Sequence, residues 1–269
     1  MNHTKIVTCI DQSDISAHVT DYAAWIATNL HKPLELFHIV DQHPSHIKNI
    51  NPKTIDVQEN YSQKLLETYH QRALDIGLNH SLIKIHEEEG NFLEKIIQYE
   101  PNIDLLVIGR RGEQTEKQQN VIGNNIQQII RSIHRPILSV AGSFSPPKNS
   151  MIAFSGSKTS QNLINQMAEK QLFLSLPLYL VMSGKQNDDR QELLAWAHQT
   201  LEDVGYNVTS SFIVGGSNIE DTIVRTVQEQ CIDILIMGAF SHTSLYNMIF
   251  GSKTVDLLRY LNIPILHLH

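Results

Sequence analysis

The stretch Ile103–Gly109 (IDLLVIG) decides the fold, because nearly the same stretch returns at Ile232–Gly238 (IDILIMG). Each is followed by a loop with a further glycine, a helical pattern and a Pro-Ile-Leu run, with these residues at Gly123 and Pro136 in the first copy and at Gly251 and Pro264 in the second. The repeat period is roughly 130 residues, far above the ~20–50 residues of a solenoid repeat. The sequence therefore predicts two copies of one domain-sized unit.

The composition is that of a globular protein large enough for two cores. Of the 269 residues, 41% are hydrophobic and 18% are charged. The formal net charge of −7 counts against broad nucleic-acid binding, which needs a basic surface. We find no basic leader and no apolar run of ~18 residues, so we expect a cytoplasmic protein with no membrane partner. Cys9 and Cys231 fall in apolar stretches of different copies and are expected to be two buried thiols.

Short apolar runs alternate with amphipathic helical patterns throughout. In the first copy we expect strands at Lys5–Ile10, Leu34–Val40, Leu82–His86, Leu105–Ile108 and Pro136–Val140, and helices from Ser13 or Asp14 to Leu30, from Thr54 to about Ile76, at Asn91–Tyr99 and up to about Ile133. In the second we expect strands at Met151–Phe154, Leu178–Met182, Val208–Val214, Ile234–Met237 and Pro264–Leu268, and helices at Thr159–Phe173, Asp188–Val204, Ile219–Gln230 and Ser252–Leu261. Glu87–Glu89 is expected to be a solvated turn, and Gly142–Ser150 a linker.

This alternation predicts an α/β fold with two tandem doubly wound, mostly parallel sheets of the Rossmann-like kind, over residues 1–144 and 150–269. Ligands of such sheets bind beyond the carboxyl ends of the strands, where the strand order reverses. We expect that edge to hold the turn at Asp11 or Ser155, the end of the second strand, and the glycine loop after the fourth strand.

The glycine loop of the second copy has the features of an anion site. Gly238 follows a buried strand, Ser241 lies three residues later, and nine further residues lead to the tetrapeptide Gly251-Ser252-Lys253-Thr254. A helix that starts at this tetrapeptide would point its free N–H groups at a phosphate, with Lys253 and the hydroxyls of Ser252 and Thr254 nearby. The pattern fits a nucleotide, but it fits a tight turn with a capping serine equally well. It is not a P-loop, because no lysine follows the second glycine directly.

The two copies, each with this strand–turn opening and a glycine loop before the last helix, resemble the universal stress protein family in its tandem form. The most specific stretch is Ile234–Ser252. The resemblance implies a role in stress survival, with ATP or AMP as a regulatory ligand rather than a substrate, although family members that lack the loop do not bind ATP. It also implies that the second strands contact adenine through backbone groups, at Val40 and Asp41 or at Val181 and Met182.

The second copy departs from the family pattern at two positions. Ser241 stands where the family has the second loop glycine, and Ser155 stands where it has an aspartate that contacts the nucleoside. The spacing to Gly251 and Ser252 is kept. This copy therefore keeps the better phosphate cradle.

The first copy departs elsewhere. It keeps the aspartate as Asp11, although Gln12 follows it, and it keeps the early loop glycines Gly109 and Gly112. Its loop has ten residues before Gly123, an asparagine at Asn124 in place of serine or threonine, acidic residues at Glu113 and Glu116, and arginines at Arg110 and Arg111 that would offset them. We therefore predict that a nucleotide binds mainly in the second copy and that the first site is weak or lost.

The last strands, Pro136–Val140 and Pro264–Leu268, would leave apolar sheet edges open. Because the equivalent strands pair in dimers of the family, we expect them to pair inside this chain as a pseudo-dimer, and a further homodimer is left open. The fourteen histidines lack metal-ligand spacing and no catalytic triad pattern is present, so we expect neither a metal nor catalysis. A nucleotide-free interaction scaffold and a slow ATPase are the alternative interpretations.

Overall fold

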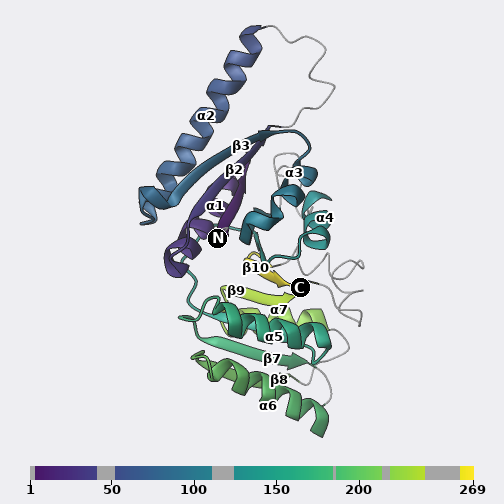
Figure 1. Cartoon of the computed structure of the whole chain (residues 1–269). Coiled ribbons are helices and arrows are strands. Elements are labelled where there is room, and N and C mark those ends of the chain that lie inside the picture. The colour runs from purple at the N-terminus through teal and green to yellow at the C-terminus, as the bar shows by residue number, and fades with distance from the viewer. Residues whose placement is uncertain (1–3, 41–51, 111–123, 184–185, 214–218, 240–260) are drawn as a thin grey trace. The chain divides into compact units, whose positions relative to one another are not determined.

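The computed structural model of the chain describes residues 4–40, 52–110, 124–183, 186–213, 219–239 and 261–269. The chain divides into two compact units, Met1–Phe144 and Ser145–His269, which are described separately below (Figure 1). The predicted pairing of the terminal strands concerns the contact between these units and stays a prediction.

The first unit is a parallel five-stranded sheet with the strand order β3-β2-β1-β4-β5. Helix α1 packs against α2, and α3 packs against α4. The long helix α2 runs beside β3 in Figure 1. In chain order the elements are β1 (Lys5–Ile10), α1 (Ile15–Leu30), β2 (Leu34–Val40), α2 (Pro52–Asp75), β3 (Ile83–Glu89), α3 (Phe92–Tyr99), β4 (Ile103–Gly109), α4 (Asn124–Ser132) and β5 (Ile137–Val140).

The second unit repeats this topology, with the strand order β8-β7-β6-β9-β10 and every pair parallel. Its elements are β6 (Ser150–Phe154), α5 (Lys158–Lys170), β7 (Leu178–Ser183), α6 (Asp188–Glu202), β8 (Val208–Ile213), α7 (Ile219–Glu229), β9 (Ile234–Gly238) and β10 (Ile265–Leu268). Each unit is thus a doubly wound α/β fold, as predicted. The helix expected at Ser252–Leu261 falls almost wholly on residues 240–260, outside the described part.

The cores lie where the sequence places its continuous apolar runs. The centres of β4 and β9 are fully buried, and Leu106 and Leu235 have no exposed surface. Strands buried on both faces of a parallel sheet are mostly apolar, which explains the repeated runs Leu105–Ile108 and Ile234–Met237. The second core also holds one polar anchor. The buried hydroxyl of Tyr206 donates to the carbonyls of Met167 (3.1 Å) and Leu172 (2.7 Å), and burial raises the pKa of this phenol.

The prediction of a solvated turn at Glu87–Glu89 is wrong. These residues form the end of β3, in register with His38–Val40 of β2. Glutamate disfavours strands, but the side chains of an edge strand can reach solvent, and Glu87 and Glu89 are exposed. Backbone pairing with β2 therefore outweighs the local preference.

The expectation of two buried thiols is wrong for Cys231, and Cys9 is only partly buried. Cys231 is exposed and lies just after α7 in a left-handed conformation (φ 48°), where its N–H closes the helix end on the carbonyl of Gln228. Both cysteines are free thiols. Burial raises the pKa of Cys9, with a further contribution from Asp11, so this thiol stays protonated.

Several predicted helix ends are displaced by a few residues. Helix α2 begins at Pro52, two residues before Thr54, which suits proline because the first helical N–H needs no partner. Asp14 occupies the cap position of α1, but its side chain makes no cap hydrogen bond. Helix α5 ends at Lys170 because Gln171 turns left-handed (φ 50°).

Candidate functional site

The strand order of each unit reverses at one place, between β1 and β4 in the first unit and between β6 and β9 in the second. The described candidate residues all lie at the carboxyl end of a strand near this place: Asp11 after β1, Val40 in β2, Gly109 in β4, Ser155 after β6, Val181 and Met182 in β7, and Gly238 in β9. The remaining candidates lie outside the described residues, namely Asp41, Gly112, Gly123, Ser241, Gly251, Ser252, Lys253 and Thr254.

The turn after β1 is organised by one carboxylate. Asp11 Oδ1 accepts hydrogen bonds from the N–H of Ser13 (3.0 Å), from the Ser16 hydroxyl (2.8 Å) and from the Ser13 hydroxyl. The N–H of Asp11 in turn donates to Ser16 Oγ (3.0 Å). Both serines are buried. Asp11 therefore fixes the turn and the first residues of α1 through an Asx-type arrangement.

The turn after β6 uses the same spacing without a charge. Ser155 takes the place of Asp11, and Ser157 and Ser160 follow at the same intervals as Ser13 and Ser16. The Ser155 hydroxyl donates to Ser157 Oγ (2.9 Å) and to Ser160 Oγ (3.1 Å). A neutral hydroxyl cluster thus replaces the carboxylate of the first unit.

Sequence reasoning considered Ser13 only as a helix cap and did not assign either pair of serines to the candidate site. The signal that reveals them is the interval: hydroxyl residues two and five positions after Asp11 and after Ser155. In both turns the N–H two positions later donates to the side chain of Asp11 or Ser155.

Two glycines of the second unit lie close to side chains of α5 and α6. Gly156 has a positive φ (80°), and a Cβ there would lie 3.2 Å from Leu193 Cδ1 and 3.6 Å from Met182 Cε. A Cβ on Gly238 would lie 3.3 Å from Thr159 Cγ2. The positive φ accounts for glycine at Gly156, whereas at Gly238 a Cβ would only require Thr159 to shift slightly.

The ends of the second strands are engaged in the sheet. Val40 is in register with Glu89, and its carbonyl accepts the N–H of Gly90 (3.1 Å). Met182 is paired on both sides, with Phe154 of β6 and Phe212 of β8. Ser183 is paired with β8 alone and passes beyond the end of β6. Backbone groups that can face a ligand therefore begin at Ser183, a residue that sequence reasoning did not select.

His38 is a second residue that sequence reasoning set aside. It is buried near the end of β2, its Nδ1 lies 3.0 Å from the carbonyl oxygen of Ile10, and its Nε2 lies 3.4 Å from Ser62 Oγ. Because a carbonyl can only accept, Nδ1 carries the proton and Nε2 is the acceptor for the serine hydroxyl. His38 therefore ties α2 to the strand end that leads into Asp11.

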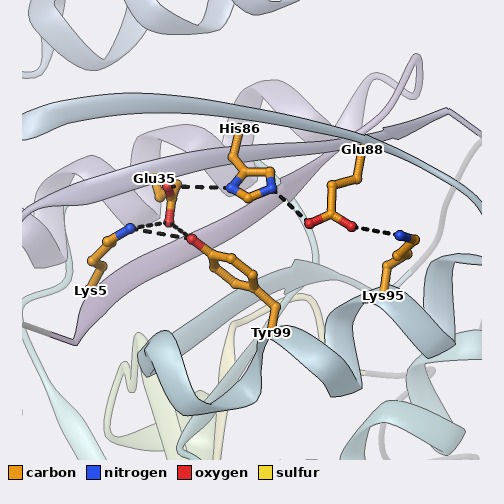
Figure 2. A network of polar contacts seen from close by, with 6 residues as sticks. All are labelled: Lys5, Glu35, His86, Glu88, Lys95 and Tyr99. Atoms are coloured by element: carbon orange, nitrogen blue, oxygen red, sulfur yellow. Dashed lines mark hydrogen bonds and ion pairs between the residues drawn. The ribbon is translucent and has the colours of Figure 1, made fainter. Parts of the chain in front are cut away.

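A second polar cluster lies in the first unit, centred on the buried carboxylate of Glu35 near the start of β2 (Figure 2). Glu35 accepts from Lys5 Nζ (2.8 Å) and from the Tyr99 hydroxyl (2.5 Å), and His86 Nδ1 is 3.7 Å away. Burial alone would lower the pKa of Lys5, but its hydrogen bonds to Glu35 and Tyr99 raise it overall. Lys5, Glu35 and Tyr99 come from β1, β2 and α3, so the cluster holds these three elements together. It is not part of the candidate site.

This cluster continues to Glu88, which gives a testable pH dependence. The hydrogen bond from Lys95 (2.9 Å) holds the pKa of Glu88 below its ordinary value. A lowered folded-state pKa gives stability that is present above the unfolded pKa and is lost as pH falls through the folded pKa. We therefore expect Lys95→Met to reduce the loss of thermal stability between about pH 5 and about pH 3. Lys84→Met, which removes an exposed lysine of β3, is the control and should keep the wild-type slope. Equal slopes in Lys95→Met and wild type would contradict the assignment.

No group of three or more histidine, cysteine or acidic side chains with a metal-binding arrangement occurs in the described ranges. Within the same ranges, no helix is both long enough and apolar enough to cross a membrane.

Comparison with known proteins agrees with this architecture. The Universal stress protein family matches the chain twice, at residues 2–141 and 148–269. The Universal stress protein Slr1230 of Synechocystis is 28% identical over 287 residues, covering 97% of this chain and 98% of that protein. The Universal stress protein MJ0577 of Methanocaldococcus jannaschii is 29% identical over 85 residues, covering 32% of this chain and 51% of that protein. A crystal structure of a universal stress protein from Archaeoglobus fulgidus has the same fold, with a TM-score of 0.72 at 14% identity, covering 99% of this chain and 97% of that one. The chain therefore belongs to the universal stress protein family and contains two copies of its domain.

Proposed function

We propose that this chain is a cytoplasmic universal stress protein with a role in stress survival, which binds ATP or AMP as a regulatory ligand, mainly in its second unit. The observation that carries the choice of unit is the sequence of the second glycine loop, which keeps the family spacing from Gly238 to Gly251 and Ser252 and adds Lys253. The nucleotide acts as a switch and is not rapidly turned over.

Electrostatics favours the second unit for a polyphosphate. A carboxylate about 7 Å from a phosphate charge disfavours binding by about 2 kcal/mol at an effective dielectric constant of 20. The first unit has Asp11 at this edge, and its glycine loop adds Glu113 and Glu116 in sequence. The second unit has neutral hydroxyls at the same edge, and its loop has Lys253 and no acidic residue between Gly238 and Thr254.

The test is isothermal titration of ATP and of AMP into the wild-type chain and into two matched variants. Gly251→Val places a branched side chain at the proposed phosphate cradle of the second unit, and Gly123→Val makes the same change at the equivalent loop position of the first. We expect Gly251→Val to weaken binding at least tenfold and Gly123→Val to leave it within about twofold. Equal affinity in all three proteins would refute the cradle, and selective loss in Gly123→Val would move the site to the first unit.

A nucleotide-free interaction scaffold is the second candidate. It is favoured by Ser155 and Asn124, which stand where the family pattern has an aspartate and a serine or threonine. Mass spectrometry of the small molecules released by denaturing natively purified protein separates the two candidates. Stoichiometric adenine nucleotide supports the switch. Its absence, together with no heat of ATP binding, supports the scaffold.

A further inference from the structure

Strand β8 is an edge strand of the second sheet without the usual protection. It is in register with β7 on one side, and among the described residues no strand pairs with its other side. Thr209, Ser210 and Ser211 are exposed. The segment Val204–Ile219, which contains the strand, has no Asp, Glu, Lys or Arg. Natural edge strands are commonly blocked by charges, prolines or bulges, and β8 itself contains neither a charge nor a proline.

The hydrogen bonds to β7 show which backbone groups of β8 face outward. The N–H of Leu178 donates to the carbonyl of Asn207 (2.9 Å), while Leu178 is in register with Val208. In a parallel pair, a residue bonds to the two residues that flank its partner, so Asn207, Thr209 and Ser211 turn their backbone groups toward β7. The N–H and C=O groups that point to the open side are those of Val208, Ser210 and Phe212.

The edge strand β3 of the first unit differs from β8 because it carries charged residues. On β3, the hydrogen bond from the Gly90 N–H to the Val40 carbonyl (3.1 Å) fixes the same alternation. The outward backbone positions at the carboxyl end of β3 are therefore Glu87 and Glu89, both exposed. Two copies of this edge would bring carboxylates together. The edge of β8 has no such barrier.

We propose that β8 is a homodimer interface, in which β8 of one copy pairs antiparallel with β8 of a second copy about a two-fold axis through Ser210. Ser210 then faces Ser210, and Val208 faces Phe212 on each side of the axis. In a hydrogen-bonded antiparallel pair the two residues exchange both backbone bonds. The three outward residues of each strand are therefore all satisfied by the other copy, in an isologous contact.

Charge argues for a second copy as the occupant. Each chain carries a formal net charge of −7, so two copies repel overall, and an uncharged surface is where they can meet without bringing carboxylates into direct contact. The segment around β8 is such a surface, whereas the neighbouring helix α6 begins with Asp188 and Asp189. A short edge supplies a small contact area, so the dimer forms at high protein concentration and is favoured by about 0.15 M salt, which screens the acidic helices.

Sedimentation velocity of the full chain over a wide concentration range tests the proposal. Ser210→Pro removes one outward N–H but none of the bonds to β7, a place where an edge strand tolerates proline. Ser210→Lys keeps the backbone and sets two ammonium groups opposite each other at the axis. Ser210→Thr keeps both the N–H and the neutral hydroxyl and is the matched control. Far-ultraviolet circular dichroism establishes that each variant is folded.

We expect a concentration-dependent dimer for wild type and Ser210→Thr, and association weakened at least tenfold in Ser210→Lys and in Ser210→Pro. A wild-type chain that is monomeric at every concentration overturns the proposal, even if it binds another protein. A dimer that persists in Ser210→Lys also overturns the proposal. The terminal strands Pro136–Val140 and Pro264–Leu268 would then be the next candidates for the dimer interface. Both readouts are independent of nucleotide, so they do not depend on the proposed function.

Discussion

Replacing Leu235 with alanine is expected to lower the free energy of unfolding of the second unit by about 3 kcal/mol. Leu235 lies in the centre of β9 with no exposed surface, in register with Met151 on one side and Ile265 on the other. Removing its isobutyl group loses the transfer free energy and leaves a cavity that a close-packed parallel sheet cannot easily collapse. Leu106 holds the equivalent position in β4 and is equally buried, so Leu106→Ala should destabilise the first unit to a similar extent.

The two tryptophans of the chain allow each unit to be followed separately. Trp25 lies in α1 and Trp196 in α6, one in each unit. Urea unfolding by fluorescence in a Trp25→Phe background reports on the second unit, and a Trp196→Phe background reports on the first. Ile85→Ala, at an exposed position of β3, is the control and should change stability by less than about 0.5 kcal/mol. A loss below about 1 kcal/mol for Leu235→Ala would show that this position does not belong to a close-packed core.

The sequence predicted the parts of the fold that depend on continuous burial. The uninterrupted apolar runs Leu105–Ile108 and Ile234–Met237 identify both central strands, because a strand covered on both faces favours apolar residues at successive positions. An edge strand whose side chains reach solvent does not need such an apolar run, so the sequence does not reveal it. Glu87–Glu89 has the composition of a turn and is a strand only because β2 supplies its hydrogen-bond partners.

The candidate site was predictable in position but not in detail. Asp11, Ser155 and Gly238 follow buried strands, and topology alone brings such residues to one edge. The role of Ser16 as a partner of Asp11, and that of His38 as a link from Ile10 to Ser62, depend on side-chain directions that no linear spacing specifies. The wrong prediction that Cys231 is buried has a similar origin. The apolar stretch around it suggested burial, but the left-handed conformation at the end of α7 leaves the residue exposed.

The ion pair between Arg72 and Asp21 joins α2 to α1 and supports the second large prediction. Arg72 Nε lies 2.6 Å from Asp21 Oδ1, Nη2 lies 2.6 Å from Oδ2, and Nε also reaches the carbonyl of Ala17 at 3.1 Å. The Asp21 side chain is only 5% exposed, whereas that of Arg72 is 41% exposed. The hydrogen bond to Asp21 raises the pKa of Arg72, so the guanidinium stays charged at any pH at which the fold is studied. The carboxylate is thus the buried partner and depends on the arginine.

Arg72→Met is therefore expected to destabilise the first unit by about 2–3 kcal/mol, because it keeps an apolar stem but leaves Asp21 buried without its bidentate partner. Arg72→Lys should cost about 1 kcal/mol, since an ammonium restores the charge but not the fork. The decisive control is Asp21→Asn combined with Arg72→Met. Removing both charges should recover at least half of the loss, because the penalty comes from an unpaired buried carboxylate rather than from a missing attraction. Trp25, one turn after Asp21 in α1, reports the unfolding of this unit in the Trp196→Phe background. A double variant no more stable than Arg72→Met would instead assign the effect to the lost contact with the Ala17 carbonyl.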